Sequence, residues 1–157
     1  GYPGGPVLDS LAKRGNPDAF TLPVPLADTE KVEFSFSGLK TAVLNLLRKL
    51  EGKGEIPVED VCASFQKTVV RALEIKMELA VRKTGVSQVT VSGGVAANSA
   101  LRETFLRRKD WNVFLPPAAL CTDNGAMVAA AAYSGYRRGR RGSLDLSPDP
   151  ALPLTSD

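Results

Sequence analysis

The most constraining feature of this sequence is residues 88–127, where two short apolar segments are each followed at once by a turn and a helix. Residues 88–92 are rich in β-branched residues and predict a buried strand. Residues 112–115 predict a second strand, which Pro116 and Pro117 end. Because the connection between the two is short and helical, the strands should be parallel with a right-handed crossover. The turns after both strands then lie at one edge of the sheet, where ligands of open α/β sheets bind.

The first of these turns carries Gly93, Gly94 and Asn98. Adjacent glycines allow a sharp turn and a close approach of the backbone to a ligand. Asn98 is a favourable N-cap for a surface helix over residues 99–108. Its amide is also suited to hydrogen bonds with a ribose or a base, so this turn is a candidate nucleotide contact.

The second turn carries Asp123, between Thr122 and Asn124, at the start of an alanine-rich helix predicted to run to about Tyr136. Taken alone, a carboxylate here is explained by capping and by the helix dipole. At a ligand-binding edge it is also a hard oxygen ligand for a metal that holds phosphates or an acyl oxygen. One carboxylate does not make a metal site, so the other ligands must come from elsewhere.

The chain opens with a predicted helix from Pro6 to about Lys13, preceded by Gly4 and Gly5. Free N–H groups at its start are able to hold an anion, and Asp9 lies one turn in, near the same end. A plain turn with an exposed carboxylate is the simpler interpretation of this segment.

Three further segments precede the first strand. Residues 16–33 contain three prolines and no apolar period, which predicts a surface loop. One helix is predicted from near Gly38 to Gly52 and a longer one over residues 58–83. The apolar face of the longer helix follows steps of three or four and consists of Val58, Val61, Cys62, Phe65, Val69, Leu73, Met77 and Ala80.

The balance of elements predicts an incomplete α/β fold. Two strands are too few for an open α/β domain, whose sheets usually have about five or six. With 43% hydrophobic and 24% charged residues, the composition is that of a soluble globular protein. We therefore expect a piece of a larger fold, or a second copy that supplies the missing surface, with residues 143–157 as an extended tail.

Charge and residue usage narrow the functional classes. A net charge of +3 allows a nucleic-acid partner without requiring one. Four arginines follow the last predicted helix, at positions 137, 138, 140 and 141. They are explained either by the favourable interaction of cations with a helix C-terminus or by contacts with a phosphate backbone. The chain has no histidine, which removes an imidazole base and the usual nitrogen ligands of a transition metal. Two cysteines give no disulfide framework and predict a cytoplasmic location, and no apolar run is long enough for a membrane span.

Four motifs stand in the order found in the TsaD family, formerly called Gcp or O-sialoglycoprotein endopeptidase, and the sequence resembles that family over about residues 1–140. The motifs are GYPGGP (1–6), FSFSGLKT (34–41), SGGVAAN (92–98) and CTDNGAM (121–127). Members are tRNA adenosine threonylcarbamoyltransferases. The resemblance implies transfer of the threonylcarbamoyl group from threonylcarbamoyl-adenylate to the exocyclic amine of the adenosine that flanks the anticodon, with release of AMP.

The resemblance also implies a fold and a distribution of roles. The family fold is actin-like and sugar-kinase-like, with two ribonuclease-H-like lobes around a nucleotide cleft. Residues 1–142 resemble the C-terminal lobe without its first strands. The residues that match nucleotide or substrate contacts are Gly5, Asp9, Gly93, Gly94 and Asn98, and Asp123 matches a ligand of iron or zinc.

That metal is shared in the family with a histidine pair of an N-terminal lobe, and this sequence has no histidine. The chain alone is therefore expected to lack transferase activity, and it reveals no nucleophile or catalytic base. The partners implied are tRNA, threonylcarbamoyl-adenylate or ATP, TsaB-like proteins of the modification complex, and a second copy at an exposed sheet or helix face. The alternatives are a small-molecule kinase or a non-catalytic nucleotide-binding lobe of the same superfold, and, least favoured, a metallopeptidase.

Overall fold

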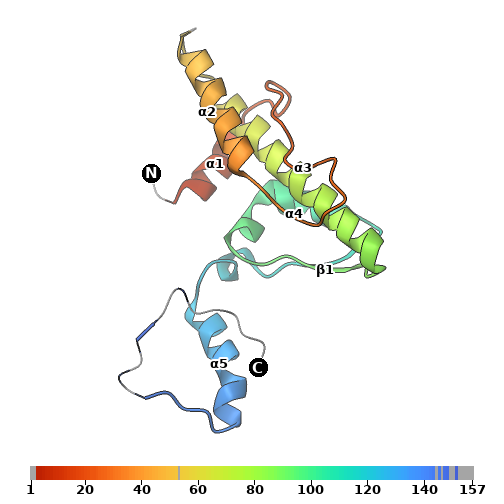
Figure 1. Ribbon diagram of the computed structural model, residues 1–157. Coiled ribbons are helices and arrows are strands. Elements are labelled where there is room, and N and C mark those ends of the chain that lie inside the picture. The colour runs from red at the N-terminus through yellow and green to blue at the C-terminus, as the bar shows by residue number, and fades with distance from the viewer. Residues whose placement is uncertain (1–2, 53, 144, 146, 149–150, 152–157) are drawn as a thin grey trace. The chain divides into compact units, whose positions relative to one another are not determined.

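A computed structural model of the chain describes residues 3–52, 54–143, 145, 147, 148 and 151. The chain forms two compact units, Gly1–Thr122 and Asp123–Asp157. The helices and strands of the first unit are α1 (Gly4–Ala12), α2 (Ser37–Glu51), α3 (Val58–Thr84), β1 (Gln88–Thr90), α4 (Ser99–Leu106) and β2 (Asn112–Phe114), with the short 3-10 helices η1 (Gly94–Ala97) and η2 (Ala118–Leu120) (Figure 1). The second unit contains α5 (Gly125–Arg137).

The two strands pair in parallel, as the sequence predicts. Val89 of β1 lies opposite Val113 of β2, and the N–H of Val91 donates to the carbonyl of Phe114 at 3.1 Å just beyond the ladder. Across the described ranges, this two-stranded sheet contains all of the strands. The chain is thus a mixed α/β structure with an incomplete sheet, and the expected shortage of strands is confirmed.

The core of the first unit lies where α3, α4 and the sheet meet. Val70, Val89, Leu101, Phe105 and Trp111 form one buried cluster. The rings of Phe105 and Trp111 meet edge to face, with centroids 5.4 Å apart. Both α1 and α4 pack against α3 (Figure 1), so the long helix is the support on which the beginning of the chain and the strand-end turn are assembled.

The loop before α2 is tied to α3 by lysines. The side chain of Lys76 is 1% exposed, and its Nζ donates to the carbonyl and the hydroxyl of Thr29 at 2.7 and 2.8 Å. Lys67 adds an exposed ion pair with Asp18 of the same loop. Described residues between α1 and α2 contain no helix or strand, which confirms the predicted surface loop.

The predicted apolar face of α3 is only partly covered, with Leu73 and Met77 half-buried against the core cluster. Of its eight residues only Val61 is buried, and Val58 is 50% exposed. Periodicity identifies apolar positions on a helix, but the packing neighbours determine which positions are covered. The buried residues of α3 are Val61, Ala63, Ser64, Gln66, Thr68, Val70, Ala72, Lys76 and Leu79.

Two helix starts also differ from expectation. α1 begins at Gly4, two residues before the predicted Pro6. A proline in the first turn is tolerated because the first N–H groups of a helix have no intrahelical partner in any case. α5 begins at Gly125 with Asn124 as its N-cap, so Asp123 precedes the helix instead of opening it. The remaining predicted helices are present.

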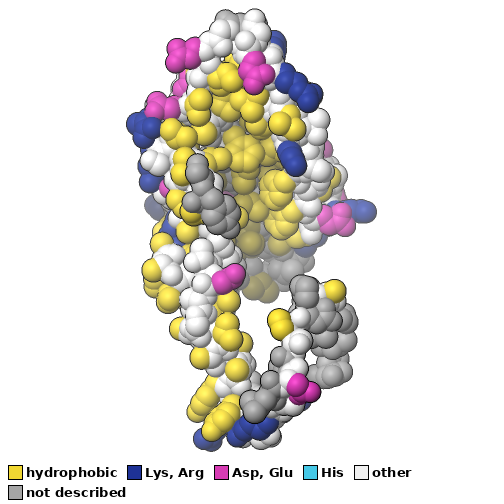
Figure 2. Space-filling view, turned by 90° about the vertical axis from the view of Figure 1, so that its left-hand side faces the viewer, with side chains coloured by type: hydrophobic (Ala, Val, Ile, Leu, Met, Phe, Trp, Pro, Cys, Tyr) yellow, Lys and Arg dark blue, Asp and Glu magenta, His cyan; other side chains and the backbone are white. Residues whose placement is uncertain are grey.

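Apolar side chains gather on one face of the first unit, as the yellow surface in Figure 2 shows. The large apolar residues that this unit exposes include Val32, Phe34, Phe36, Leu44 and Val58. Of the helices in the described ranges, none has the length and apolar character that a bilayer crossing requires.

Candidate functional site

The turn after β1 is organised by the side chain of Asn98. Its Oδ1 accepts the N–H of Leu101 at 3.0 Å, which confirms the predicted N-cap of α4. Its Nδ2 donates to Oε1 of Gln66 at 2.7 Å and to Oδ1 of Asp9 at 3.2 Å. A single amide therefore joins α4 to α3 and to α1.

Asp9 completes the same cluster from the beginning of the chain. Besides the Asn98 amide, its Oδ1 accepts the hydroxyl of Ser99 at 2.7 Å and the N–H of Ser99 at 3.3 Å. Its Oδ2 lies 3.3 Å from Nζ of Lys13. A carboxylate at the N-terminus of α4 is stabilised by the exposed N–H groups and the dipole of that helix. The structure thus brings together Asp9 and Asn98, two predicted site residues that are far apart in the sequence.

Gln66 and Ser99 are members of this cluster that the sequence prediction missed. Gln66 is only 8% exposed, and Ser99 is half-buried. Gln66 lies next to apolar positions of a long helix, and buried polar side chains need hydrogen-bond partners. That placement was a signal for a structural polar contact, although it did not identify the partner.

The predicted glycines leave open space beside the backbone. A Cβ built at Gly5, Gly93 or Gly94 would meet no heavy atom within 4 Å among the residues described. Gly93 has φ 85° and ψ 174°, a backbone conformation that is essentially restricted to glycine. Gly94 follows it as the first residue of η1. The turn is therefore shaped by glycine and accessible on the glycine side, as a contact with a ligand would require.

Arg102 connects this turn to the turn after β2. Its Nη1 donates to the carbonyl of Ala96 at 2.9 Å and to the carbonyl of Pro116, also at 2.9 Å. The same nitrogen lies 3.9 Å from Sγ of Cys121, a buried residue whose thiol is 3.5 Å from the carbonyl of Pro117. The sequence prediction did not single out Arg102.

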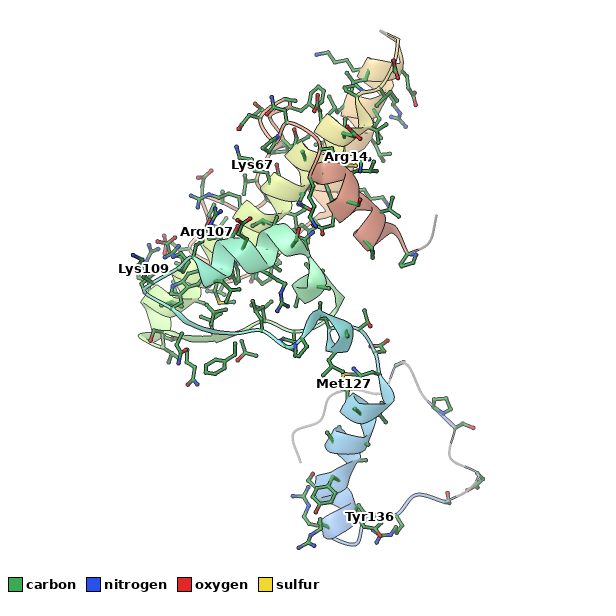
Figure 3. The ribbon with its side chains drawn as sticks, turned by 180° about the vertical axis from the view of Figure 1, so that it is seen from behind. Arg14, Lys67, Arg107, Lys109, Met127 and Tyr136 are labelled. Atoms are coloured by element: carbon green, nitrogen blue, oxygen red, sulfur yellow. The ribbon has the colours of Figure 1, made fainter. Side chains whose placement is uncertain are left out.

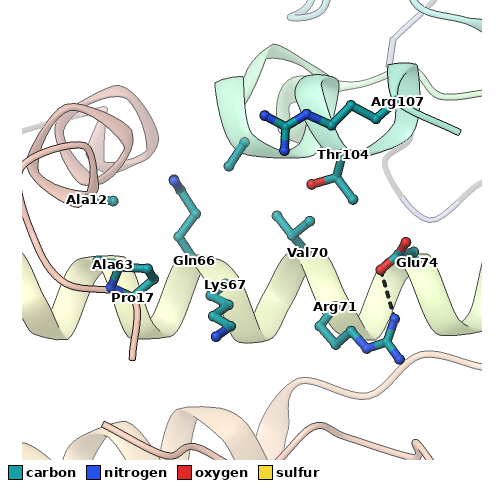
Figure 4. Close-up of a pocket in the computed structure, with 11 residues that line it drawn as sticks. Ala12, Pro17, Ala63, Gln66, Lys67, Val70, Arg71, Glu74, Thr104 and Arg107 are labelled. Atoms are coloured by element: carbon teal, nitrogen blue, oxygen red, sulfur yellow. Dashed lines mark hydrogen bonds and ion pairs between the residues drawn. The ribbon is translucent and has the colours of Figure 1, made fainter. Parts of the chain in front are cut away.

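A groove of 480 Å³ lies between α1, α3 and α4 (Figure 4). The basic side chains at its rim are paired, Arg71 with Glu74 at 2.9 Å, Lys67 with Asp18, and Arg107 with Glu103. Its lining residues are Ala12, Pro17, Ala63, Gln66, Lys67, Val70, Arg71, Glu74, Ala100, Thr104 and Arg107. None of the predicted site residues is among them, but Gln66 lines this groove and also binds the amide of Asn98.

Asp123 differs from the other predicted site residues because it belongs to the second unit. It is exposed, and the adjacent Asn124 caps α5 by accepting the N–H of Met127 at 2.9 Å. Within the described parts of the chain, no three His, Cys, Asp or Glu side chains are grouped so as to hold a metal ion. The donors among the described residues therefore do not fit a complete iron or zinc site.

The arginines after α5 make local contacts. The guanidinium of Arg141 stacks over the ring of Tyr136 at 4.0 Å, and its Nη1 donates to the carbonyls of Tyr136 and Arg140. These contacts agree with cations at a helix C-terminus. Of the basic side chains labelled in Figure 3, Lys67 lies on α3, Arg14 follows α1, and Arg107 and Lys109 follow α4. Contact with a phosphate backbone stays a prediction.

Cys62 has the properties of an unreactive thiol. Its side chain is half-buried on α3, and burial raises the pKa of the thiol. Because the thiolate is the nucleophile, a raised pKa lowers reactivity at neutral pH. This residue is therefore not a candidate nucleophile.

Known proteins resemble this chain over most of its length. The family model for TsaD, described as tRNA N6-adenosine threonylcarbamoyltransferase, matches residues 1–130. A protein of that name from Clostridium botulinum strain 657 is 49% identical over 158 residues, which cover 98% of this chain and 46% of the relative. The protein of that name from Thermotoga neapolitana is 48% identical over 157 residues, with 98% and 47% covered. The chain therefore spans about half the length of these relatives.

Proposed function

This chain belongs to the TsaD family of tRNA N6-adenosine threonylcarbamoyltransferases, and from this premise we propose that it supplies one wall of the adenylate site of a tRNA-modifying enzyme. In the proposed reaction, the exocyclic amine of a tRNA adenosine attacks the carbamoyl carbon of threonylcarbamoyl-adenylate. A C–N bond forms, the C–O bond to the phosphate breaks, the amine loses a proton and AMP leaves. The family match over residues 1–130 is the observation that carries this proposal.

The strand-end turn supports the proposal as a place where a nucleotide is held. Gly93 and Gly94 leave the backbone approachable, and Gly5 leaves open space at the start of α1. Nδ2 of Asn98 donates to Oδ1 of Asp9, and this bond helps to fix both side chains. Preorganised polar groups of this kind contribute by orienting the substrate, which converts binding energy into rate. We propose that the chain forms part of a ribonuclease-H-like lobe of an actin-like fold, with this turn facing the nucleotide.

The proposed metal, iron or zinc, would take Asp123 as one ligand. When bound, such an ion polarises phosphate or carbonyl oxygens. A single exposed carboxylate does not fit a complete site, so the remaining ligands would lie in the half of the relatives' length that this chain does not span. We derive no step through the metal and assign no catalytic base.

The proposed partners follow from the same premise. They are tRNA, threonylcarbamoyl-adenylate, TsaB-like proteins of the modification complex and, at an exposed apolar face, a second copy of the chain, in the cytoplasm. Size-exclusion chromatography tests the last of these, because a monodisperse monomer contradicts self-association.

The decisive experiment joins this chain to the half of the Thermotoga neapolitana relative that it does not match. The chimera is assayed with threonylcarbamoyl-adenylate and unmodified tRNA, and the unaltered relative is the positive control. We expect threonylcarbamoyl transfer by the chimera and none by the chain alone. A folded chimera that phosphorylates a small substrate from ATP, or that transfers nothing, contradicts the proposal.

A further inference from the structure

We propose that Arg102 is a positioning residue that fixes the two strand-end turns of the adenylate site relative to each other. The inference rests on the proposed function for the identity of the site, but the contacts of Arg102 stand independently of it. One nitrogen, Nη1, reaches the carbonyl of Ala96 in η1 and the carbonyl of Pro116 after β2, at 2.9 Å each.

The two carbonyls belong to irregular segments that follow neighbouring parallel strands. β1 and β2 hold these segments side by side only as far as Thr90 and Phe114, where the ladder ends. Beyond the bond from Val91 to Phe114, the carbonyls of Ala96 and Pro116 lie outside the ladder and need another donor. Arg102 supplies this donor to both segments at once.

A guanidinium is suited to this task because it is planar, permanently charged and presents several donors in a fixed geometry. Its use here differs from that of its neighbours on the same helix and the following turn. Arg107 pairs with Glu103, and Arg108 pairs with Glu74, Glu78 and Asp110. For Arg102, the described residues place no carboxylate within 4.0 Å of the guanidinium. The side chain thus donates hydrogen bonds to main-chain carbonyls and forms no ion pair among the described residues.

The helix that carries Arg102 also carries the nucleotide-turn amide. The N–H of Arg102 donates to the carbonyl of Asn98 at 3.1 Å, so both residues lie in the first turns of α4. Loss of the bond from Arg102 to Pro116 should therefore shift the first turn of α4, and with it Asn98 and its partners Asp9 and Gln66. Arg102 touches the site through these groups and is not assigned a contact with substrate.

The test compares Arg102→Met and Arg102→Lys with Arg107→Met, a matched arginine on the exposed side of the same region. Amide hydrogen exchange is measured for residues 94–98 and 118–121 in the purified chain, and AMP binding is measured by calorimetry. We expect Arg102→Met to accelerate exchange in both segments and to weaken AMP binding about tenfold, which corresponds to about 1.4 kcal/mol. Exchange in α3 should stay unchanged in every variant.

Two further arms exclude a general loss of folding. Arg102→Lys keeps the charge but not the planar donor geometry, so it should behave like Arg102→Met. Arg102→Ala with guanidinium ion added at a sub-denaturing concentration should recover slow exchange in both segments. Equal exchange in the Arg102→Met and Arg107→Met variants, or full retention by Arg102→Lys, overturns the proposal. Failure of the unaltered chain to bind AMP counts against the proposed function, whereas the exchange measurements still decide whether Arg102 holds the turns.

Discussion

The turn that carries Asn98 and the turn that carries Asp123 look equivalent in the sequence, but they are built differently. Each follows a short strand and leads into a helix. Asn98 is half-buried and bonded to groups on three helices of the first unit. Asp123 is exposed and belongs to the second unit. A position at the end of a strand therefore does not by itself make a preorganised site.

The difference arises from what supports each turn. The first turn rests on α1 and α3, which contribute Asp9 and Gln66. The second turn leads into α5, and no described residue of that helix is buried. A site residue is held in place by its neighbours, and Asn98 has such neighbours on α1 and α3.

The largest expected contrast is between a buried side chain of the first unit and an exposed side chain of the second. Phe105→Ala removes a ring that is 1% exposed and stacked edge to face on Trp111, and it should destabilise the first unit by about 3–5 kcal/mol. Tyr133→Ala, at 61% exposure on α5, should change stability by less than about 0.5 kcal/mol. Trp111 is the only tryptophan, so urea denaturation followed by its fluorescence reports on the first unit. Equal losses for both variants would remove the contrast.

The next contrast compares two helix caps. Asn98→Ala removes the cap of α4, the donor to Oε1 of Gln66 and one of the donors to Asp9, which keeps its bonds from Ser99, for a loss of about 2–4 kcal/mol. Asn124→Ala removes the cap bond to Met127 and should destabilise α5 by about 0.5–2 kcal/mol. The loss of helix is followed by circular dichroism.

Asn98→Asp is the control for this pair because it keeps the cap acceptor but places a carboxylate next to Asp9. It should be as damaging as Asn98→Ala if the contacts with Asp9 and Gln66 dominate. A mild effect of Asn98→Asp would show that Asn98 is an ordinary cap, like Asn124.

The sequence predicted the parts of this fold that local chemistry determines. The N-cap at Asn98, the parallel strands and the ends of the longest helix all follow from residue type and period over a few positions. The fully buried positions of α3 were predicted only in part because they depend on the docking of α1, α4 and the lysine-anchored loop. These contacts join residues that are far apart in the chain, and a single sequence gives no information on them.

The same distinction applies to the site. Asp9 and Asn98 were candidates from motif and position, and the structure shows that they touch. Arg102 was missed because an arginine on a helix has no special local signal, and the position of Gln66 beside apolar residues does not identify its partner. Their roles become visible only when the acceptors, such as the carbonyls of Ala96 and Pro116, are placed by the fold.

A smaller contrast separates the two glycines of the first turn. Gly93→Ala forces a side chain into a glycine-only conformation and should cost about 1–3 kcal/mol. Gly94→Ala meets no atom within 4 Å and does not require positive φ, so it should stabilise the first unit by about 0.4–1 kcal/mol. Urea midpoints from Trp111 fluorescence measure both changes. Effects of the same sign would show that the turn does not have the described backbone shape.

The smallest expected effect belongs to Asp123. Because its side chain is exposed, Asp123→Ala should change the free energy of unfolding of the first unit, measured by urea denaturation, by less than about 0.5 kcal/mol. Added Zn²⁺ or Fe²⁺ should leave the unfolding temperature of the chain unchanged, since a ligand stabilises only in proportion to its affinity and one carboxylate binds weakly. The Asp123→Ala variant in the presence of the metal is the matched control. A metal-dependent rise in the unfolding temperature that disappears in this variant would mean that the chain holds the ion itself, and the second turn would then be as complete a site as the first.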